Sequence, residues 1–509
     1  MAKRARISRR NSTAKLISPA SPYIQRKLPF FDVLTEEEML RIDDQVDWMI
    51  ENIGVAFRDD PAALDVWRKA GITPTGPHND LIKADAKWIR SLCANAPKQF
   101  TQHARNPERS VVIGGNNQVF APIYGAPFVR DLEGGRRYAQ FSDFEKLLKL
   151  CYMHPNLHHT GLVIAEPTDI PVSKRHLDML YAHLVLNDKP HLGAITEKSR
   201  AQDSVDMVEV MFGKEAMDSQ VCIMANVNTN SPMLVDKVVT EAIATYSSRG
   251  QAMVVTPFIL TGAMGPVSTA ASVAQAITET LFCCAFAQLI RKGAPFVMGN
   301  FLSSMSLKTG APTFGMPEPV MSNYAIGQMA RRLNLPLRCG GSLTASKIED
   351  AQAAYESADS MHSTMMAGSN FTLHGAGWLE GGLATGFEKL IMDADRLGSY
   401  QKVLGLGLET DENAFARDAY LEVEPGGHFL GSDHTMRNYQ NIFYEPHLSD
   451  SDNVESWEDG GAKDMRVRAF ERWNDMLENY QEPPIDEAKK EELAAFVARR
   501  KSELPDAWY

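Results

Sequence analysis

The densest group of residues that could do chemistry lies at 372–382, which reads Thr-Leu-His-Gly-Ala-Gly-Trp-Leu-Glu-Gly-Gly. His374 ends an apolar run, and Trp378 offers a π face, which attracts cations. Glu380 adds a counter-charge, and four glycines let a ligand approach the backbone closely. The stretch predicts a site for a cationic ligand. The alternative is that Trp378 is ordinary packing and Glu380 a surface or capping residue.

A second glycine-rich stretch, Arg338-Cys-Gly-Gly-Ser-Leu-Thr-Ala-Ser-Lys347, follows the preceding apolar run. Capping of the next helix would explain its hydroxyl residues. Polar residues also follow most other apolar runs, and they are mostly uncharged. This predicted ring comprises Glu166, Thr196, Glu197, Asn226, Asn228, Thr256, Asn300, Ser303, Arg338, His374, Trp378, Glu380 and His428.

Several enzyme classes lack their signatures in this chain. There is no HExxH, no Walker loop, no GxSxG and no pair of carboxylates at glycosidase spacing. We expect no metal site, because the neighbours His158 and His159 would point opposite ways on a strand, one buried and one facing a loop. The best-marked hydrolases and phosphoryl-transfer enzymes are therefore excluded.

Short apolar runs that alternate with helical segments must position these residues. The runs recur every 30–50 residues, and an eighth one, His428–Leu430, is weak. Alternating buried strands and helices predict parallel βαβ units, and eight of them predict an α/β fold of the (β/α)₈ TIM-barrel type beginning near Leu157. The seven clear runs are Leu162–Ala165, His191–Ile195, Val221–Val227, Ala252–Thr256, Pro295–Phe301, Leu335–Arg338 and Phe371–His374.

Local signals mark some helix starts. Thr35 with Glu38, and Ser142 with Glu145, have capping-box spacing and predict helices from about 36 and 143. Ser231-Pro232 has the residue types of an N-cap and first-turn pair. The segment 270–291 is apolar nearly all round, as in a helix packed between neighbours.

The chain of 509 residues divides, by these patterns, into four parts. We predict a basic disordered arm at 1–30, a helical N-terminal cap at 31–150, the barrel at 151–450, and a helical tail at 451–509 packed on the barrel. Residues 1–27 hold eight Lys/Arg and no Asp/Glu, while the whole chain carries a net charge of −12. The acidic body argues against a nucleic-acid enzyme.

Composition bounds the compartment. Six cysteines without a CxxC pair indicate neither a disulfide framework nor a zinc-ligand set. No window approaches the ~20 uninterrupted apolar residues of a membrane span, and the basic arm lacks the apolar core of a secretory signal. We expect a cytoplasmic protein and a homo-oligomer that binds neither membrane nor nucleic acid.

The order of several motifs resembles the trimethylamine methyltransferase family, the amine:corrinoid-protein methyltransferases, over about residues 30–450. The resemblance implies a (β/α)₈ barrel that moves a methyl group from a methylated amine to cobalt. The motifs are Val129–Arg137, Ala165-Glu-Pro167, Arg175-His-Leu-Asp178, Thr309–Pro312 with Phe314-Gly315 and Pro317-Glu318, Asp350-Ala-Gln352, Gly377–Gly382, and Pro425–Gly431 with His434-Thr435.

Members of that family take their cobalt from a corrinoid on a separate small protein. This chain has no DxHxxG, the motif whose histidine ligates cobalt in such proteins. The resemblance therefore implies no tightly bound cofactor, with cobalamin supplied by a transient corrinoid-binding partner. The methanogen enzymes carry a pyrrolysine opposite Gly341–Thr344, where this chain has ordinary residues. It is thus similar to the non-pyrrolysine branch, which implies a quaternary amine such as glycine betaine.

The resemblance also implies site roles. His374 and Glu166 are the expected catalytic residues, and Gly340 and Gly341 form part of the cavity wall. The cation would meet Trp378 and Glu380, with Phe301, Tyr324 and Tyr355 as further candidates, although the two tyrosines lie in predicted helices. A betaine carboxylate would meet Arg338, Lys308 or His374.

Two other classes of function stay open on sequence. One is a barrel lyase or hydrolase that acts alone on a cationic metabolite, although the chain shows no general-base or metal set for it. The other is a catalytically inactive amine-binding barrel, although His374 and Gly377–Gly382 are intact.

Overall fold

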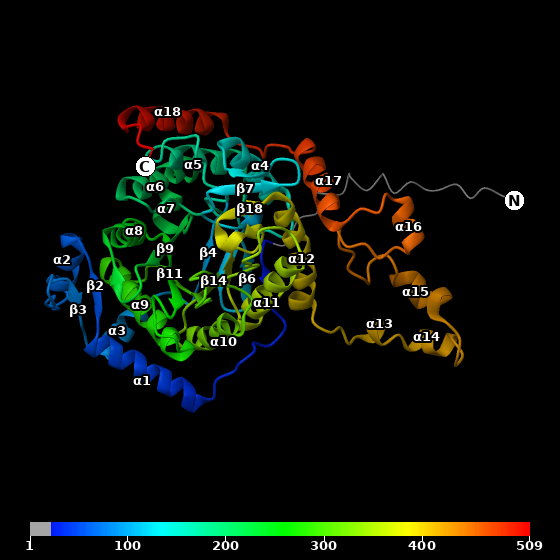
Figure 1. Cartoon of the computed structure of the whole chain (residues 1–509), viewed down its shortest axis with the longest axis horizontal. Helices are drawn as coiled ribbons and strands as arrows, with labels where there is room; N and C mark the ends of the chain where they lie inside the picture. Colours follow the sequence, from blue (N-terminus) through cyan, green and yellow to red (C-terminus); the bar gives the residue numbers. More distant parts are fainter. Residues whose placement is uncertain (1–21, 509) are drawn as a thin grey trace.

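A computed structural model describes residues 22–508 of the chain. Its centre is a ring of parallel strands surrounded by helices (Figure 1). Six strands of the ring are regular, and they pair in parallel from β9 through to β6. These strands are β6 (Asn117–Phe120), β9 (Met224–Thr229), β11 (Ala252–Thr261), β12 (Phe296–Gly299), β15 (Leu337–Gly340) and β16 (Phe371–Leu373).

Two irregular segments, 158–162 and 191–194, complete the ring between β6 and β9. The N–H groups of His158 and His159 donate to Phe120 O, and the N–H of Leu192 donates to Gly161 O. Gly193 N–H then donates to Met224 O in β9. Eight segments therefore close on themselves, and the predicted (β/α)₈ barrel is confirmed.

The position of the first strand was predicted wrongly. The eighth strand is β6, which lies inside the region assigned to the N-terminal cap, so the barrel begins near 117 and not near Leu157. The weak candidate His428–Leu430 is instead an exposed stretch around the short helix η5 (Phe429–Gly431). Only three apolar residues in that run gave it the look of a strand.

One helix follows each barrel segment and covers it from outside. In order these are α4 (Phe141–Met153), α5 (Arg175–Val185), α6 (Lys198–Phe212), α8 (Lys237–Ser248), α9 (Thr269–Ile290), α10 (Pro317–Arg332), α11 (Ala351–Ala367) and α12 (Phe387–Leu406); α7 (Lys214–Ser219) extends α6. Within the described part of the chain, α9 alone is long and apolar enough to cross a membrane, and 89% of its apolar window is buried inside the fold. It is the packed helix that its all-round apolar pattern predicts.

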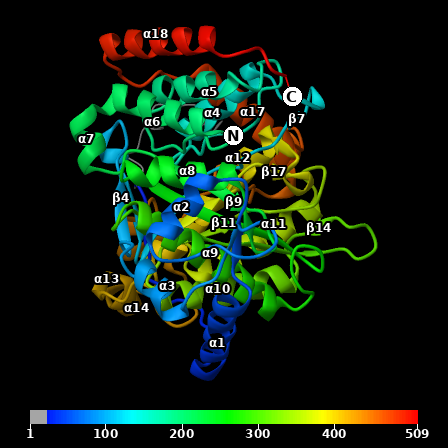
Figure 2. The ribbon, with the colours of Figure 1, turned by 90° about the vertical axis from the view of Figure 1, so that its left-hand side faces the viewer.

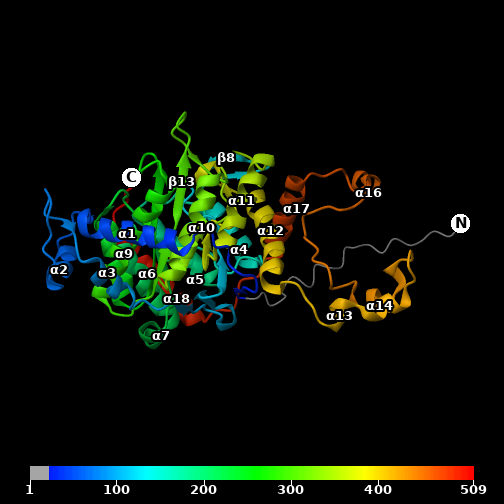
Figure 3. The same cartoon turned by 90° about the horizontal axis from the view of Figure 1, so that it is seen from below.

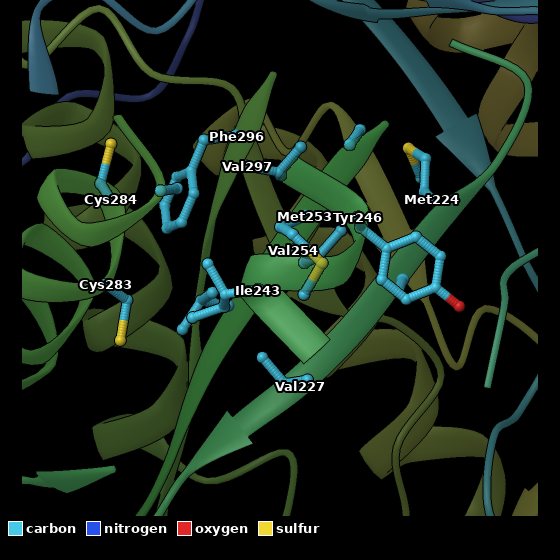
Figure 4. Packing of buried hydrophobic residues seen from close by; sticks show 14 of the residues in the cluster. Met224, Val227, Ile243, Tyr246, Met253, Val254, Cys283, Cys284, Phe296 and Val297 are labelled. Carbon is cyan, nitrogen blue, oxygen red and sulfur yellow. The ribbon is translucent and has the colours of Figure 1, made fainter. Parts of the chain in front are cut away.

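Figure 4 shows how this packing holds the barrel wall. Val254 and Val297 from neighbouring strands lie beside Ile243 of α8, while Cys283 and Cys284 face them from α9. Fully burying one such aliphatic or aromatic side chain contributes about 1.5–3 kcal/mol. The apolar core thereby fixes the strand ends that carry the polar residues.

The N-terminal region is a mixed cap on one side of the barrel. Its elements are β1 (Ile24–Gln25), α1 (Glu36–Asn52), β2 (Val55–Phe57), α2 (Pro61–Lys69), β3 (Leu81–Ile82), α3 (Ala86–Cys93), β4 (Gln99–Gln102), η3 (Pro107–Arg109) and β5 (Val111–Gly114), and β2 also pairs with β10 (Leu234–Val235). The predicted box of Thr35 and Glu38 is present. The box predicted at Ser142 is shifted, because Gln140 and Asp143 form it. Ser231-Pro232 caps no helix: α8 begins at Lys237, capped by Asp236.

The predicted basic arm lies mostly outside the described residues. Its end, however, is part of the fold, because β1 pairs with β6 and Arg26 is buried. The Arg26 guanidinium donates to the backbone oxygens of Met365, Leu28 and Pro29. An arm that is separate from the folded body can therefore extend no further than residue 21.

The C-terminal region runs along the outside of the molecule (Figure 1). Two of its helices pack on the barrel, as predicted: Trp473 of α17 donates to Glu388 of α12, and Arg500 of α18 pairs with Asp203 of α6. The other helices project beyond α12. The region comprises α13 (Glu412–Phe415), α14 (Arg417–Glu422), η5, α15 (Asp433–Asn438), α16 (Val454–Asp459), α17 (Met465–Glu478) and α18 (Glu487–Glu503).

Buried histidines should make the fold sensitive to acid. His158 and His159 are both buried, so the expected loop-facing partner is wrong. Burial lowers the pKa of His154, His158 and His183 to about 3, with the charge of Lys189 as a further cause for the first two and that of His191 for the third. In the unfolded chain these groups titrate near ~6.5, so the unfolded state binds more protons below that pH.

We therefore expect the free energy of unfolding to fall by roughly 1 kcal/mol per histidine for each pH unit below about 6.5. Urea titrations at several pH values measure this slope. In a His154→Asn variant the amide oxygen can still accept the Asn156 N–H, and the slope should drop by about one proton. An unfolding free energy that stays constant as the solution is acidified from neutral pH contradicts the expectation.

Candidate functional site

The site is centred on His374, at the carboxyl end of β16. Its backbone has a φ of 63°, in the left-handed region, and its N–H donates to Pro122 O. The ring nitrogen Nδ1 accepts from Tyr124 N–H at 3.2 Å, so the ring proton lies on Nε2. Burial lowers the pKa of His374 well below its ordinary value, and the charge of Arg338 acts in the same direction. His374 is therefore a neutral donor in the folded protein.

Aromatic rings surround His374. Phe301, which opens β13 (Phe301–Met305), stacks on the imidazole with 5.4 Å between ring centroids. Trp378 of β17 (Trp378–Leu379) meets the imidazole edge-on at 4.6 Å and Phe314 at 5.6 Å. Its Nε1 donates to Thr344 O, and the side chain is buried. Trp378 therefore supports His374 and Phe301 from behind.

Arg338 of β15 brings a positive charge into the same group. It is 1% exposed, its guanidinium carbon lies 5.2 Å from the Phe301 ring centroid, and Nη1 donates to Asn300 O at 3.1 Å. Among the described residues no carboxylate forms an ion pair with it, and Nε has no hydrogen-bond partner. Desolvation lowers the pKa of Arg338 to about 10, so the group is still charged at neutral pH. Buried charges of this kind are normally paired.

Two glycines bring the backbone against these side chains. A Cβ on Gly341 would lie 2.6 Å from Gly375 Cα and 2.8 Å from His374 O. A Cβ on Gly340 would lie 3.3 Å from Phe301. The strand ends of β15 and β16 can approach His374 because these positions carry no side chain.

Glu166 lies across the mouth from Arg338, on the loop after the segment 158–162. It forms an ion pair with Arg175 of α5 at 2.8 Å, and its side chain is 35% exposed. Its charge also raises the pKa of Tyr124, after desolvation, the larger cause. Glu166, Tyr124 and His374 are thus linked through the backbone and field of one loop.

Other predicted residues do not converge with these. Glu380 forms an ion pair with Arg136 of β8 (Gly135–Tyr138), with both carboxylate oxygens 2.9 Å from Nε. Lys308 lies in the exposed turn between β13 and β14 (Pro312–Thr313), a hairpin that projects from the barrel (Figure 3). Tyr355 is exposed on α11, and Tyr324 packs against Phe31.

Three aromatic residues were missed from the sequence. Phe258 lies 5.1 Å from Phe301 between ring centroids, and both are half-buried at the strand ends. Tyr124 provides the N–H that orients His374, and Phe314 packs behind Trp378. Phe258 lies two residues beyond the predicted end of its strand, because β11 continues to Thr261. A pattern extended by one alternation would have included it.

Among residues 22–508 no cluster of three or more His, Cys, Asp or Glu side chains is arranged to hold a metal ion. The arrangement instead combines half-buried aromatic faces, a neutral imidazole donor and a buried guanidinium. Such a set can hold a small molecule that carries a fixed cation at one end and an anion at the other.

Comparison with known proteins gives a consistent family. The model of the family described as trimethylamine methyltransferase (MTTB) matches residues 2–505. A glycine betaine methyltransferase of Desulfitobacterium hafniense is 36% identical over 94% of this chain and 98% of its own length. Trimethylamine methyltransferases of D. hafniense and Methanosarcina thermophila are each 24% identical, over 92% and 89% of this chain and 94% of theirs.

Solved structures give a more distant likeness. The monomethylamine methyltransferase of Methanosarcina barkeri is 10% identical, with a TM-score of 0.46, over 88% of this chain and 98% of that one.

Proposed function

The chain belongs to the trimethylamine methyltransferase family and is a methyltransferase, and from this premise we propose that it demethylates a quaternary amine that carries a carboxylate, with glycine betaine as the leading substrate. The methyl acceptor is Co(I) of a corrinoid carried by a small partner protein. Neither the amine nor the acceptor is held permanently.

The proposed reaction is an in-line displacement. The Co(I) electron pair forms a bond to the methyl carbon while the carbon–nitrogen bond breaks. The nitrogen keeps that bond's electron pair and leaves as a neutral tertiary amine, so no proton is transferred at nitrogen. The protein contributes orientation and electrostatics.

The observation that carries the betaine proposal is the isolated charge of Arg338. Its buried guanidinium has an unpartnered Nε and no carboxylate beside it in the described chain. A ligand carboxylate would supply both the charge and the acceptor, and charge-assisted bonds of this type are strong. Trimethylamine has no such group.

We place the cation against the accessible rings. Phe258 and Phe301 are half-buried and lie on the mouth side, whereas Trp378 is covered by its neighbours. Cation–π contacts of desolvated ligands contribute on the order of 2 kcal/mol. Trp378 then acts by holding Phe301 and His374 in place.

The two predicted catalytic residues receive different roles. His374, neutral and fixed as the Nε2–H tautomer by Tyr124 N–H, orients the substrate through a hydrogen bond. Glu166 faces the mouth with its charge partly offset by Arg175, where it favours the cationic substrate over the neutral product. Gly340 and Gly341 form the wall below Phe301.

Because His374 stays neutral, methyl transfer should not follow an ordinary histidine titration. We expect kcat to be level through about pH 6–8, across the range where an unperturbed imidazole titrates near ~6.5. Initial rates with saturating glycine betaine and cob(I)alamin measure this profile. A rate that changes tenfold per pH unit around 6.5 would indicate that an ionising imidazole takes part.

We further propose a cytoplasmic, homo-oligomeric enzyme. All six cysteines are free thiols and buried, which suits a reducing compartment. The barrel mouth has to admit the corrinoid protein, so the partner would meet the strand-end loops and the β13–β14 hairpin in a transient, partly polar contact.

Product analysis tests the proposed function. Purified protein, cob(I)alamin and glycine betaine should give methylcobalamin and dimethylglycine in equal amounts. Loss of glycine betaine without cobalamin would support the lyase or hydrolase instead. Binding of glycine betaine without turnover under either condition would support an inactive amine-binding barrel.

A further inference from the structure

The projecting C-terminal segment 408–443, here called the arm, exposes an unusual number of large apolar side chains. Ten of the 28 exposed large apolar residues in the described chain lie in these 36 residues. Leu408 and Leu421 are each 90% exposed and Phe443 is 81% exposed. Scattered single residues of this kind are ordinary, but a concentration marks an interaction surface.

The arm is ordered by contacts within itself. Arg437 pairs with Asp418, His434 Nε2 donates to Asn413 O, and Asp433 N–H donates to Glu422. Every side-chain hydrogen bond that the structure gives the arm joins two arm residues. The chain regains the barrel only at Tyr444, which donates to Asp395 O. The arm is thus preformed yet unpacked.

A groove of about 530 Å³ lies beside the root of the arm. It is formed by β1 and the end of α12, and the exposed Val403 and Leu408 continue its apolar surface. Its lining includes Ile24, Lys27, Gly398, Gly405, Leu406 and Tyr444.

We propose that the arm embraces a second copy of this chain, each arm lying over the groove and α12 surface of the other. Five aromatic and five aliphatic side chains of the arm expose on the order of 1,000 Å², taking about 150–250 Å² per aromatic side chain. A stable interface needs about 800 Å² from each partner. The area is therefore sufficient for a permanent dimer.

Charge also fits a partner of the same sequence. The arm holds seven Asp/Glu and two Lys/Arg, whereas residues 1–21 hold six Lys/Arg and no Asp/Glu. Those residues lead into Pro22, which lines the groove. Two copies related by a two-fold axis would bring the basic segment of one near the acidic arm of the other.

The position of the arm separates this contact from the methyl-transfer partner. Figure 2 shows α13 and α14 on one side of the barrel and the β14 hairpin, which marks the mouth, on the opposite side. A dimer formed through the arms leaves the mouth open. An apolar surface of this extent suits a permanent contact better than a partner that must leave after each transfer.

Sedimentation of the full chain tests the proposal. The wild-type protein should sediment as a multiple of the 56.4 kDa chain, and the double variant Leu421→Glu/Phe443→Glu at half that mass or less. Both side chains are so exposed that the change should leave the far-ultraviolet circular dichroism spectrum unaltered.

The matched control is Leu40→Glu/Trp48→Glu on α1, where the residues are 47% and 51% exposed. It should keep the wild-type mass. A wild-type protein of single-chain mass would overturn the proposal. So would an arm variant of wild-type mass, or a control that dissociates to the same extent.

Discussion

Replacing Arg338 by Met should lower kcat/KM for glycine betaine by about 100-fold, mostly through a higher KM. Truncating one side of a buried, hydrogen-bonded charge pair costs about 2–5 kcal/mol, and each ~1.4 kcal/mol is a factor of ten. The guanidinium would bind the carboxylate in both the ground state and the transition state, so KM should carry the effect. Initial rates of methylcobalamin formation over a range of betaine concentrations measure it.

Three controls separate binding from folding. Tetramethylammonium has no carboxylate, so its rate should be the same with wild type and Arg338→Met. The free energy of unfolding should be equal or higher in the variant, because Met removes a desolvated charge that no described residue pairs. Arg136→Met removes an arginine that pairs with Glu380 instead, and it should leave the betaine rate near wild type. Equal losses for betaine and tetramethylammonium would contradict the carboxylate role.

Replacing His374 by Ala should depress methyl transfer by at least an order of magnitude. The substitution removes the Nε2–H donor and the ring against which Phe301 and Trp378 pack. Orientation and preorganised polarity supply most of the catalysis expected for this reaction. Single-turnover formation of methylcobalamin at saturating substrate isolates this step from binding.

Backbone strain complicates that variant, and a second one resolves it. A φ of 63° disfavours Ala, whereas Asn tolerates this region better. His374→Asn can also accept the Tyr124 N–H. We expect the Asn variant to fold as wild type and to remain at least tenfold slower. Wild-type turnover by a folded Asn variant would show that His374 only supports the structure.

The sequence pattern predicted the barrel because seven of its apolar runs overlap, adjoin or nearly reach barrel segments. It failed at β6, a four-residue strand whose register is set by pairing with β16, far away in sequence. It also failed at 231–232, because the carboxylate of Glu279, 48 residues away, accepts from Ser231 and Met233 and fixes that loop. Contacts of this kind are not encoded in local spacing.

The site shows the same division. The glycine spacing around His374 and the polar residue Arg338 at a strand end predicted a shared site, and the structure brings those two residues together against Phe301. Nothing in the sequence showed that Arg136 would pair with Glu380, or that the β13–β14 turn would carry Lys308 outward. Phe258 and Tyr124 were missed because aromatic residues at strand ends look like core.

The central claim is that a fixed cation with a carboxylate is demethylated and a tertiary amine is not. The most direct measurement compares methylcobalamin formation from glycine betaine, other betaines and trimethylamine at equal concentration with purified protein and cob(I)alamin. We expect a betaine to react and trimethylamine to give no rate above the protein-free background, because the free amine offers a poor leaving group and no partner for Arg338. A trimethylamine rate that matches or exceeds that of every betaine would contradict the account.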